Sequence, residues 1–320
     1  MRHIGRKIEY KNKSGLPVIS EYGGRRLGGR ELRDFALQLR RDVVELTYYS
    51  GTQSSHLGGE LSSADIVAAL YGCALSLRPE EPDWPERDVF IMSKGHCSGL
   101  LYAAMAWRGF FPRDMLWNEF NRAGGLLQEH CNLHLPGVEA ATGSLGMGLA
   151  NGCGYAWSAK HDGQNSRRVY VLLGDGECTE GQTWEGMGLA AQLRLDNLVA
   201  IVDYNKYVIS STIGEVLSIE PIEERWRSFG WHTQRVDGHD LDAVEAALRK
   251  AADAGAAPGM PRAIICDTVK GKGIQFMEKD PIHWHAGHLD GALYNACMAE
   301  LGVACMAELG DKQTGVAGNG

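Results

Sequence analysis

The chain has 320 residues, of which 44% are hydrophobic, and a formal net charge of -8 at pH 7. This length suits one large domain or two small ones, and the negative charge leaves no broad basic surface for nucleic acid. No apolar run reaches the roughly 18 residues of a membrane span, and the basic N-terminus lacks the apolar segment of a signal peptide, so we expect a cytoplasmic protein that binds no membrane. Eight cysteines without a C-x-x-C pair predict reduced, mostly buried thiols.

The first elements predicted along the chain are an arm and two helices. Residues 1–30 are rich in Lys, Arg and Gly and are expected to form a weakly ordered N-terminal arm. From Glu31 to Leu46 the apolar residues recur at helical spacing, and "LSSADIVAALYGCAL" repeats that pattern with Ser62 or Ser63 as N-cap. Both segments are predicted to be helices.

Short apolar runs then alternate with helical stretches. The runs are "DVFIMS" (88–93), "RVYVLLGDG" (168–176), "NLVAIVDYN" (197–205) and "RAIICDTV" (262–269), and the helix "DLDAVEAALRKAADAG" has Asp240 as N-cap and Gly255 as stop. Continuous apolar strands separated by helices indicate a parallel sheet flanked by helices, which is the α/β class. We expect one domain over residues 31–290, and a short C-terminal helix with a loose tail over residues 291–320.

Two polar residues stand at the ends of predicted strands, Asp175 within Gly-Asp-Gly and Asn205 after the next strand. In open parallel sheets, ligands bind beyond the carboxyl ends of the strands. A carboxylate, an amide oxygen and a backbone carbonyl are hard ligands that would complete a Mg²⁺ site together with two phosphate oxygens and a water. A bare Gly-Asp-Gly is more often a turn that caps the following helix, so the spacing to Asn205 carries the argument.

The interval of 30 positions between Asp175 and Asn205 resembles the thiamine diphosphate motif. Around it, "KGHCSGLLYAAMAWRGF", "PGVEAATGSLGMGLANGCGYAWSAKHDG" and "TVKGKGIQFMEKDPIHWHAG" are together similar to the N-terminal half of transketolase, in the version divided between two chains. The resemblance implies the thiamine diphosphate-binding fold of the pyrophosphate domain. It implies Mg²⁺, or Ca²⁺ or Mn²⁺, at Asp175, Asn205 and the carbonyl of Tyr207. The implied cofactor contacts are His96, Gly143, Ser144, Leu145, Asp175, Gly176, Glu177, Asn205, Tyr207 and His285.

The same resemblance assigns four catalytic histidines, His56, His96, His130 and His285, with His130 and His285 nearest the reacting hydroxyls. Imidazole is suited to moving protons near neutral pH. For the remaining lone histidines His3, His161, His232 and His239 we prefer a structural role. The spacing of His283, His285 and His288 could also suggest zinc, but neither a cysteine pair nor a carboxylate-and-histidine helix accompanies it.

The implied activity is transfer of a two-carbon ketol unit from a ketose or ketose phosphate to an aldehyde. In the family, the glutamate that activates the cofactor lies in the other half of the polypeptide. We therefore expect activity only with a partner, a C-terminal transketolase subunit carrying the pyrimidine-binding domain, in an α₂β₂ complex. Glu180 and Glu185 match acidic positions that reach across the family's subunit interface.

Several positions depart from the family pattern: Leu57, Glu129, Cys131 and Lys206. Glu129 and Cys131 flank His130 where Gly and Pro are usual, which puts the substrate in doubt. Two alternatives therefore remain open. One is a 2-oxo-acid-decarboxylating subunit, similar to deoxyxylulose-phosphate synthase or to a dehydrogenase E1, and the other is a non-catalytic scaffold that binds cofactor.

Overall fold

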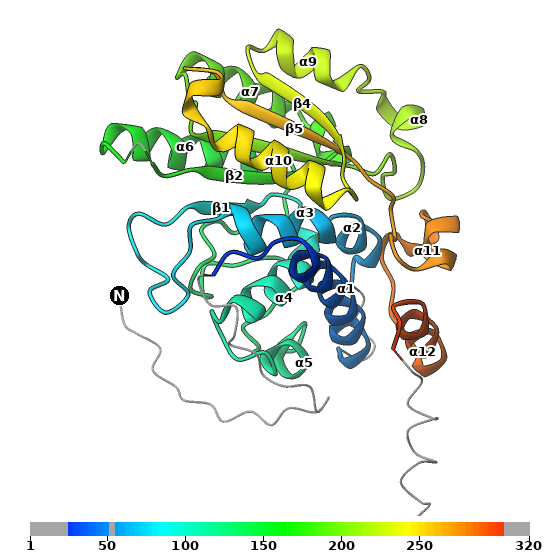
Figure 1. Ribbon diagram of the computed structural model, residues 1–320. Coiled ribbons are helices and arrows are strands. Elements are labelled where there is room, and N and C mark those ends of the chain that lie inside the picture. Colours follow the sequence, from blue (N-terminus) through cyan, green and yellow to red (C-terminus); the bar gives the residue numbers. More distant parts are fainter. Residues whose placement is uncertain (1–24, 51–54, 165, 304–320) are drawn as a thin grey trace, which may run out of the picture.

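A computed structural model describes residues 25–50, 55–164 and 166–303 (Figure 1). Its sheet has five parallel strands in the order β1-β2-β3-β5-β4. The strands are β1 (Val89–Met92), β2 (Val169–Gly174), β3 (Leu198–Tyr204), β4 (His232–Asp237) and β5 (Arg262–Asp267). The helices are α1 (Arg30–Tyr49), α2 (Leu57–Ser62), α3 (Ala64–Ala69), α4 (Ser98–Arg108), α5 (Met115–Glu119), α6 (Met147–His161), α7 (Gly181–Gln192), α8 (Ile213–Leu217), α9 (Ile222–Ser228), α10 (Leu241–Ala252), α11 (Gln275–Lys279) and α12 (Gly291–Glu300).

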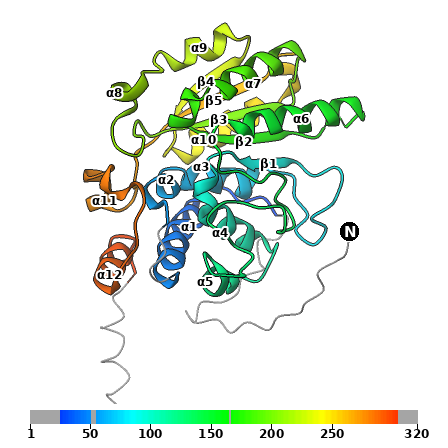
Figure 2. The ribbon, with the colours of Figure 1, turned by 180° about the vertical axis from the view of Figure 1, so that it is seen from behind.

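Helices cover both faces of the sheet, as Figures 1 and 2 show. Alternate residues of each strand enter two separate cores, since side chains along a strand point to opposite faces. Tyr170 and Leu172 of β2 pack with α1, α3, α4 and α10, whereas Val169 and Val171 pack with α6, α7 and α9. Burial on both faces explains why the central strands are continuously apolar.

The four strands expected from the apolar runs are confirmed, and the α/β class with them. The sheet also contains β4, "HTQRVD", which the apolar pattern does not predict. β4 lies at the edge of the sheet opposite β1, and its side chains are only partly buried and largely polar.

Two details of the helices differ from expectation. The second predicted helix forms as α3 followed by a π-helical turn over Leu70–Ala74, and the short helix α2 precedes it. Ser63 is at the N-cap position of α3, but its hydroxyl donates to the carbonyl of Gly59 and makes no side-chain cap bond. The helix capped by Asp240 does form, but it ends at Ala252, before Gly255.

The parts of the chain expected to be an arm and a tail fall largely outside the described residues, which begin at Arg25 and end at Val303. The seven described cysteines are free and buried. No helix in the described ranges is long and apolar enough to cross a membrane.

Candidate active site

The carboxyl ends of the parallel strands place Asp175 and Asn205 at the same edge of the sheet. Asp175 is 2% exposed, and its carboxylate accepts hydrogen bonds from the backbone N–H of Gly176 (2.7 Å) and of Lys206. The Asn205 amide oxygen accepts from the N–H of Tyr207 at 3.1 Å. Burial, followed by the nearby Asp203 carboxylate, raises the pKa of Asp175 to about 7. The edge therefore carries a buried carboxylate for which a cation would be a favourable neighbour.

Beneath this edge a fully buried ion pair joins β3 to the loop after β1. Lys94 lies against the Asp203 carboxylate and donates to the Gly59 carbonyl at 2.9 Å. Asp203 also accepts from the hydroxyls of Ser62 (2.6 Å) and Thr268. These partners hold the pKa of Asp203 below its usual range against the effect of burial, and Asp203 raises that of Lys94.

The residues implied to line the cofactor lie on the loops of this edge. The Glu177 carboxylate accepts from the Ser93 hydroxyl and from the N–H groups of Gly146 (2.8 Å) and Gly174 (3.3 Å), so it ties three loops together. Ser144 is exposed and Leu145 half-buried, both just before α6.

Three of the four predicted histidines converge. The ring centroids of His56 and His96 are 4.9 Å apart, those of His56 and His285 are 5.3 Å apart, and those of His96 and His285 are 6.0 Å apart. His130 is exposed and lies beside Gly143, where an added Cβ would come within 2.6 Å of the imidazole. Gly143 also has a φ of 142°, so both space and conformation favour glycine there.

The environment of His285 specifies which ring nitrogen carries its proton. Its Nδ1 lies 2.8 Å from the Lys270 ammonium, which also donates to the Val208 carbonyl at 2.9 Å. Burial, and then Lys270, lowers the pKa of His285 to about 3, while burial lowers that of Lys270 to about 8. A neutral imidazole that accepts at Nδ1 carries its proton on Nε2, where it can donate to a ligand oxygen.

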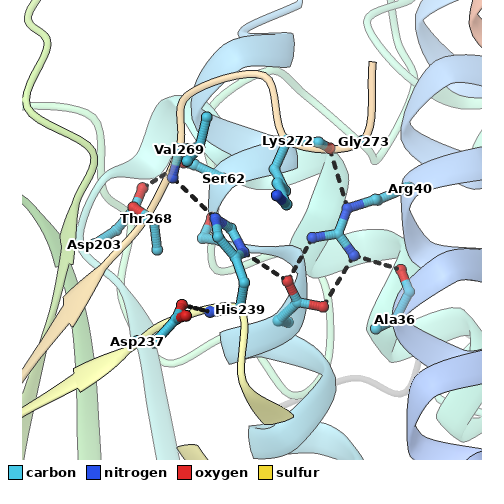
Figure 3. Close-up of polar contacts among 12 residues, drawn as sticks. Ala36, Arg40, Ser62, Asp203, Asp237, His239, Thr268, Val269, Lys272 and Gly273 are labelled. Atoms are coloured by element: carbon cyan, nitrogen blue, oxygen red, sulfur yellow. Dashed lines mark hydrogen bonds and ion pairs between the residues drawn. The ribbon is translucent and has the colours of Figure 1, made fainter. Parts of the chain in front are cut away.

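Lys270 and Thr268 belong to a strap, residues 268–273, that leaves β5 and crosses the edge of the sheet. A network behind the site anchors this strap (Figure 3). The Val269 N–H donates to His239 Nε2 at 2.9 Å, and His239 Nδ1 lies 2.8 Å from Asp65. Asp65 is paired with Arg40, which donates to the Lys272 carbonyl at 3.1 Å.

Three further histidines and two glutamates are exposed. His134, His283 and His288 are exposed, and no group of three or more His, Cys, Asp or Glu side chains in the described part of the chain is arranged to hold a metal. Glu180 and Glu185 are exposed before and within the first turns of α7.

Comparison with known proteins shows which family the chain resembles. Residues 38–304 match the family described as "Transketolase, thiamine diphosphate binding domain". The chain is 40% identical over 247 residues to 6-deoxy-6-sulfo-D-fructose transketolase subunit SqwG of Clostridium sp. (strain MSTE9), covering 77% of this chain and 88% of the relative. It is 37% identical over 262 residues to an apulose-4-phosphate transketolase subunit of Phocaeicola vulgatus, covering 82% and 90%. The chain belongs to the transketolase family.

The share of each relative that the match covers distinguishes transketolase subunits from undivided transketolases. Human transketolase is 37% identical, and the match covers 84% of this chain but 42% of that protein. Among solved structures, transketolase from Campylobacter jejuni superposes with a TM-score of 0.79 at 29% identity, covering 88% of this chain and 44% of that one. For Leishmania mexicana transketolase the TM-score is 0.77 at 28% identity, with 86% and 42% covered. The chain is thus a transketolase-type transferase subunit that corresponds to the N-terminal, thiamine diphosphate-binding part, as its motifs predicted.

Sequence reasoning missed several residues of this transketolase site, notably Lys94, Asp203 and Lys270. Each had a signal: Lys94 follows an apolar strand directly, Asp203 interrupts an apolar run, and Lys270 stands in the quoted "TVKGKG". A charged residue inside or at the end of a buried strand requires a partner, and that requirement alone would have singled them out.

Proposed function

We propose that this chain binds thiamine diphosphate with Mg²⁺ and, together with a C-terminal partner subunit in an α₂β₂ complex, transfers a two-carbon ketol unit from a ketose or its phosphate to an aldehyde. The observation that carries the proposal is that one edge of the sheet carries a buried carboxylate, which accepts only from backbone N–H groups, together with three converging histidines. The relatives named as transketolase subunits support the need for a partner.

The residues present fit a divalent cation. Asp175 is buried with only backbone N–H groups as hydrogen-bond donors, and burial, followed by repulsion from Asp203, raises its pKa to about 7; a positive ion would stabilise the ionised carboxylate. Asp175 and the Asn205 amide oxygen, with the carbonyl of Tyr207, form the hard-oxygen set that Mg²⁺ prefers. The diphosphate would lie by Gly176 and by the loop of Gly143 to Leu145.

Bound thiamine diphosphate supplies the electron sink that allows a carbon–carbon bond next to a carbonyl to break. The side chains of this chain orient the substrate and move protons. His285, neutral and protonated on Nε2, donates a hydrogen bond to a substrate oxygen, and Lys270 holds its ring in place. His56 and His96 form the rest of the same wall.

The test is hydroxypyruvate consumption, with thiamine diphosphate and Mg²⁺ added, by this chain alone and by its complex with the partner. We expect activity only in the complex, and Asp175→Ala should abolish Mg²⁺-dependent cofactor binding. The matched control Asp162→Ala changes an exposed carboxylate at the end of α6 and should bind cofactor normally. Consumption of pyruvate but not hydroxypyruvate would favour the decarboxylating alternative, and unchanged cofactor affinity of Asp175→Ala would refute the metal assignment.

A further inference from the structure

Glu60 of α2 is a fully buried carboxylate that the proposed chemistry does not use. Its Oε2 accepts a hydrogen bond from the Ser55 hydroxyl at 2.8 Å, whereas its Oε1 makes no hydrogen bond within the described part of the chain. Oε1 lies against the backbone of Gly99 in α4, where an added Cβ would come within 2.5 Å of it. The carboxylate is therefore enclosed between two helices with one of its two oxygens satisfied.

A carboxylate in this position lowers the stability of the fold. Burial raises the pKa of Glu60 to about 7, against the smaller effects of the Ser55 hydroxyl and of His56. A buried polar atom without a partner is unfavourable, whereas replacing both members of a buried polar pair by apolar groups of the same shape is often neutral or stabilising. The one hydrogen bond that the Glu60 side chain makes, to Ser55, is therefore where its role should be sought.

Glu60 holds the backbone on both sides of His56. Its carboxylate binds the hydroxyl of Ser55, the residue before His56, and its own N–H donates to the His56 carbonyl at 3.1 Å. Ser55 is 1% exposed, so its hydrogen bond to Glu60 is shielded from water. The position of His56 at the start of α2 thus depends on both the side chain and the backbone of Glu60.

Ser55 is in turn paired with the loop that carries His285. The N–H of Ser55 donates to the Gly287 carbonyl at 3.0 Å, and the N–H of Gly287 donates to the Ser55 carbonyl at 3.0 Å. His56 follows Ser55 directly, His285 precedes Gly287 by two residues, and the two ring centroids are 5.3 Å apart. Glu60 is thus connected to both rings through one hydroxyl and one pair of backbone hydrogen bonds.

We infer that Glu60 is a positioning residue that, through the Ser55 hydroxyl, keeps Ser55 paired with Gly287 and so sets the spacing of the His56 and His285 rings. This inference rests on the proposed ketol transfer, in which both rings belong to the wall that contacts the substrate. Glu60 is fully buried and acts only through Ser55. Because a misplacement of about 1 Å can slow a reaction by roughly two orders of magnitude, losing this hydrogen bond should lower kcat while the cofactor site stays intact.

A double-mutant cycle in the assembled, cofactor-loaded complex tests the role of this hydrogen bond. Glu60→Met keeps a side chain of similar size that cannot accept from Ser55, and Ser55→Ala removes the donor. Each should lower kcat for ketol transfer by about tenfold and leave the affinity for thiamine diphosphate within about twofold. The double variant should show no further loss. Losses that add in the double variant, or an unchanged kcat in Glu60→Met, would overturn the inference.

Two measurements separate positioning from a role in stability alone. The double variant removes both members of the buried pair, so the thermal midpoint of its complex should equal or exceed that of the wild type. Glu60→Gln keeps an oxygen that can accept from Ser55, so its kcat should remain within about threefold of the wild-type value. A double variant with a lower midpoint and wild-type kcat would show that the pair only supports the fold, which would overturn the inference.

The chain offers a matched control for each substitution. Glu45→Met replaces another buried carboxylate, in α1, whose Oε2 also lacks a partner among the described residues. Ser63→Ala removes another fully buried hydroxyl, which donates to the Gly59 carbonyl at 2.8 Å. Both controls should keep kcat within about twofold of the wild-type value. A loss in either control as large as that in Glu60→Met would contradict a specific role for Glu60.

Hydrogen exchange tests the coupling without any activity, and so separates this inference from the proposed function. In the complex without cofactor, Glu60→Met should accelerate exchange of the Ser55 and Gly287 amides by about fivefold, while the amides of β3 keep their protection. Unchanged exchange at both amides would show that Glu60 does not hold this pairing, whatever the activity. If the wild-type complex transfers no ketol unit, the proposed function fails, and the exchange result still decides the coupling.

Discussion

At the scale of single residues, the site rests on a charge pair that is excluded from water. The side chains of Lys94 and Asp203 are 2% and 0% exposed, so neither charge is screened. Such a pair adds little net stability over apolar residues, but losing one member strands the other charge in the interior. The intact pair therefore contributes little to the free energy of unfolding, whereas removing either Lys94 or Asp203 should lower it strongly.

Lys94→Met tests this dependence of Asp203 on its partner, because methionine has a side chain of similar length without the charge. We expect the free energy of unfolding to fall by about 3–5 kcal/mol, measured by urea denaturation with tryptophan fluorescence. Lys160→Met is the control: its partner Asp196 is also close, at 2.7 Å, but the side chains are 33% and 25% exposed. Such a pair contributes at most about 1 kcal/mol. Equal losses in the two variants would contradict the argument.

Glu45 predicts a pH dependence of stability. Its side chain is buried in α1, and Oε2 has no hydrogen-bond partner among the described residues. Burial, and then Asp42, raises the pKa of Glu45 to about 7. Between the unfolded value of 4.5 and about 7 the folded chain binds the extra proton, so stability contributed by neutral Glu45 is lost as pH rises through that window.

Glutamine at position 45 is neutral at every pH, so the Glu45→Gln variant should not lose stability as the pH rises. Relative to the wild type, its free energy of unfolding should be nearly unchanged at pH 4 and higher by about 3 kcal/mol at pH 8, measured by urea denaturation across this range. Glu80→Gln, at an exposed position, should show no such divergence. A constant difference between Glu45→Gln and wild type at all pH values would show that Glu45 is ionised in the folded chain.

At the scale of elements, the strap of residues 268–273 connects the site to the opposite side of α3. Its front contacts are Thr268 to Asp203 and Lys270 to His285. Its rear contacts run through His239 and Arg40 to Asp65 (Figure 3). His239, for which the sequence favours a structural role, accepts at Nε2 and donates at Nδ1. One imidazole thus joins β4, α3 and the strap.

His239→Ala should loosen the strap without unfolding the sheet. The hydrogen bond from the Val269 N–H to His239 is exposed, and a typical hydrogen bond is worth about 1 kcal/mol. Hydrogen exchange of the Val269 amide should therefore accelerate roughly fivefold while the amides of β3 keep their protection. His232→Ala, at the other end of β4, is the control and should leave the strap unchanged. Exchange at Val269 that does not respond to His239→Ala would mean that the other contacts of the strap hold it in place without His239.

The strands and the site contacts differ in how well they could be predicted from the sequence. Continuous apolar runs predicted β1, β2, β3 and β5, because burial on both faces requires them. β4 lies at one edge of the sheet and, unlike β1 at the opposite edge, is only partly buried, so it needs no such run and was missed. Asp175 and Asn205 could be paired from their positions at strand ends, whereas Lys94 with Asp203 and His56 with Glu129 join segments 109 and 73 positions apart, where only the folded chain shows the contact. The hydrophobic periodicity of a sequence does not reveal contacts between residues so far apart along the chain.

At the scale of the molecule, α6 and α7 together leave apolar side chains uncovered. The helices pack closely where Gly186 meets Leu149, since a Cβ on Gly186 would lie 3.3 Å from that side chain. On their outer sides Trp157 is 49% exposed and Leu189 47% exposed. Both helices start beside the edge of the sheet that carries Asp175 and Glu177, and Trp157 and Leu189 lie further along them.

Leu189→Asp places a charge in that surface and should prevent assembly while leaving the chain folded. An unpaired charge buried in an interface is strongly unfavourable, so co-expressed partner should no longer co-purify, and light scattering should report the mass of the chain outside the complex. Circular dichroism should remain that of the wild type. Met260→Asp is the matched control, since Met260 is 38% exposed and precedes β5 at the amino edge of the sheet, away from the site. If Leu189→Asp assembles and transfers ketol units normally, the partner binds another face, and the exposed Glu180 and Glu185 have no interface to reach across.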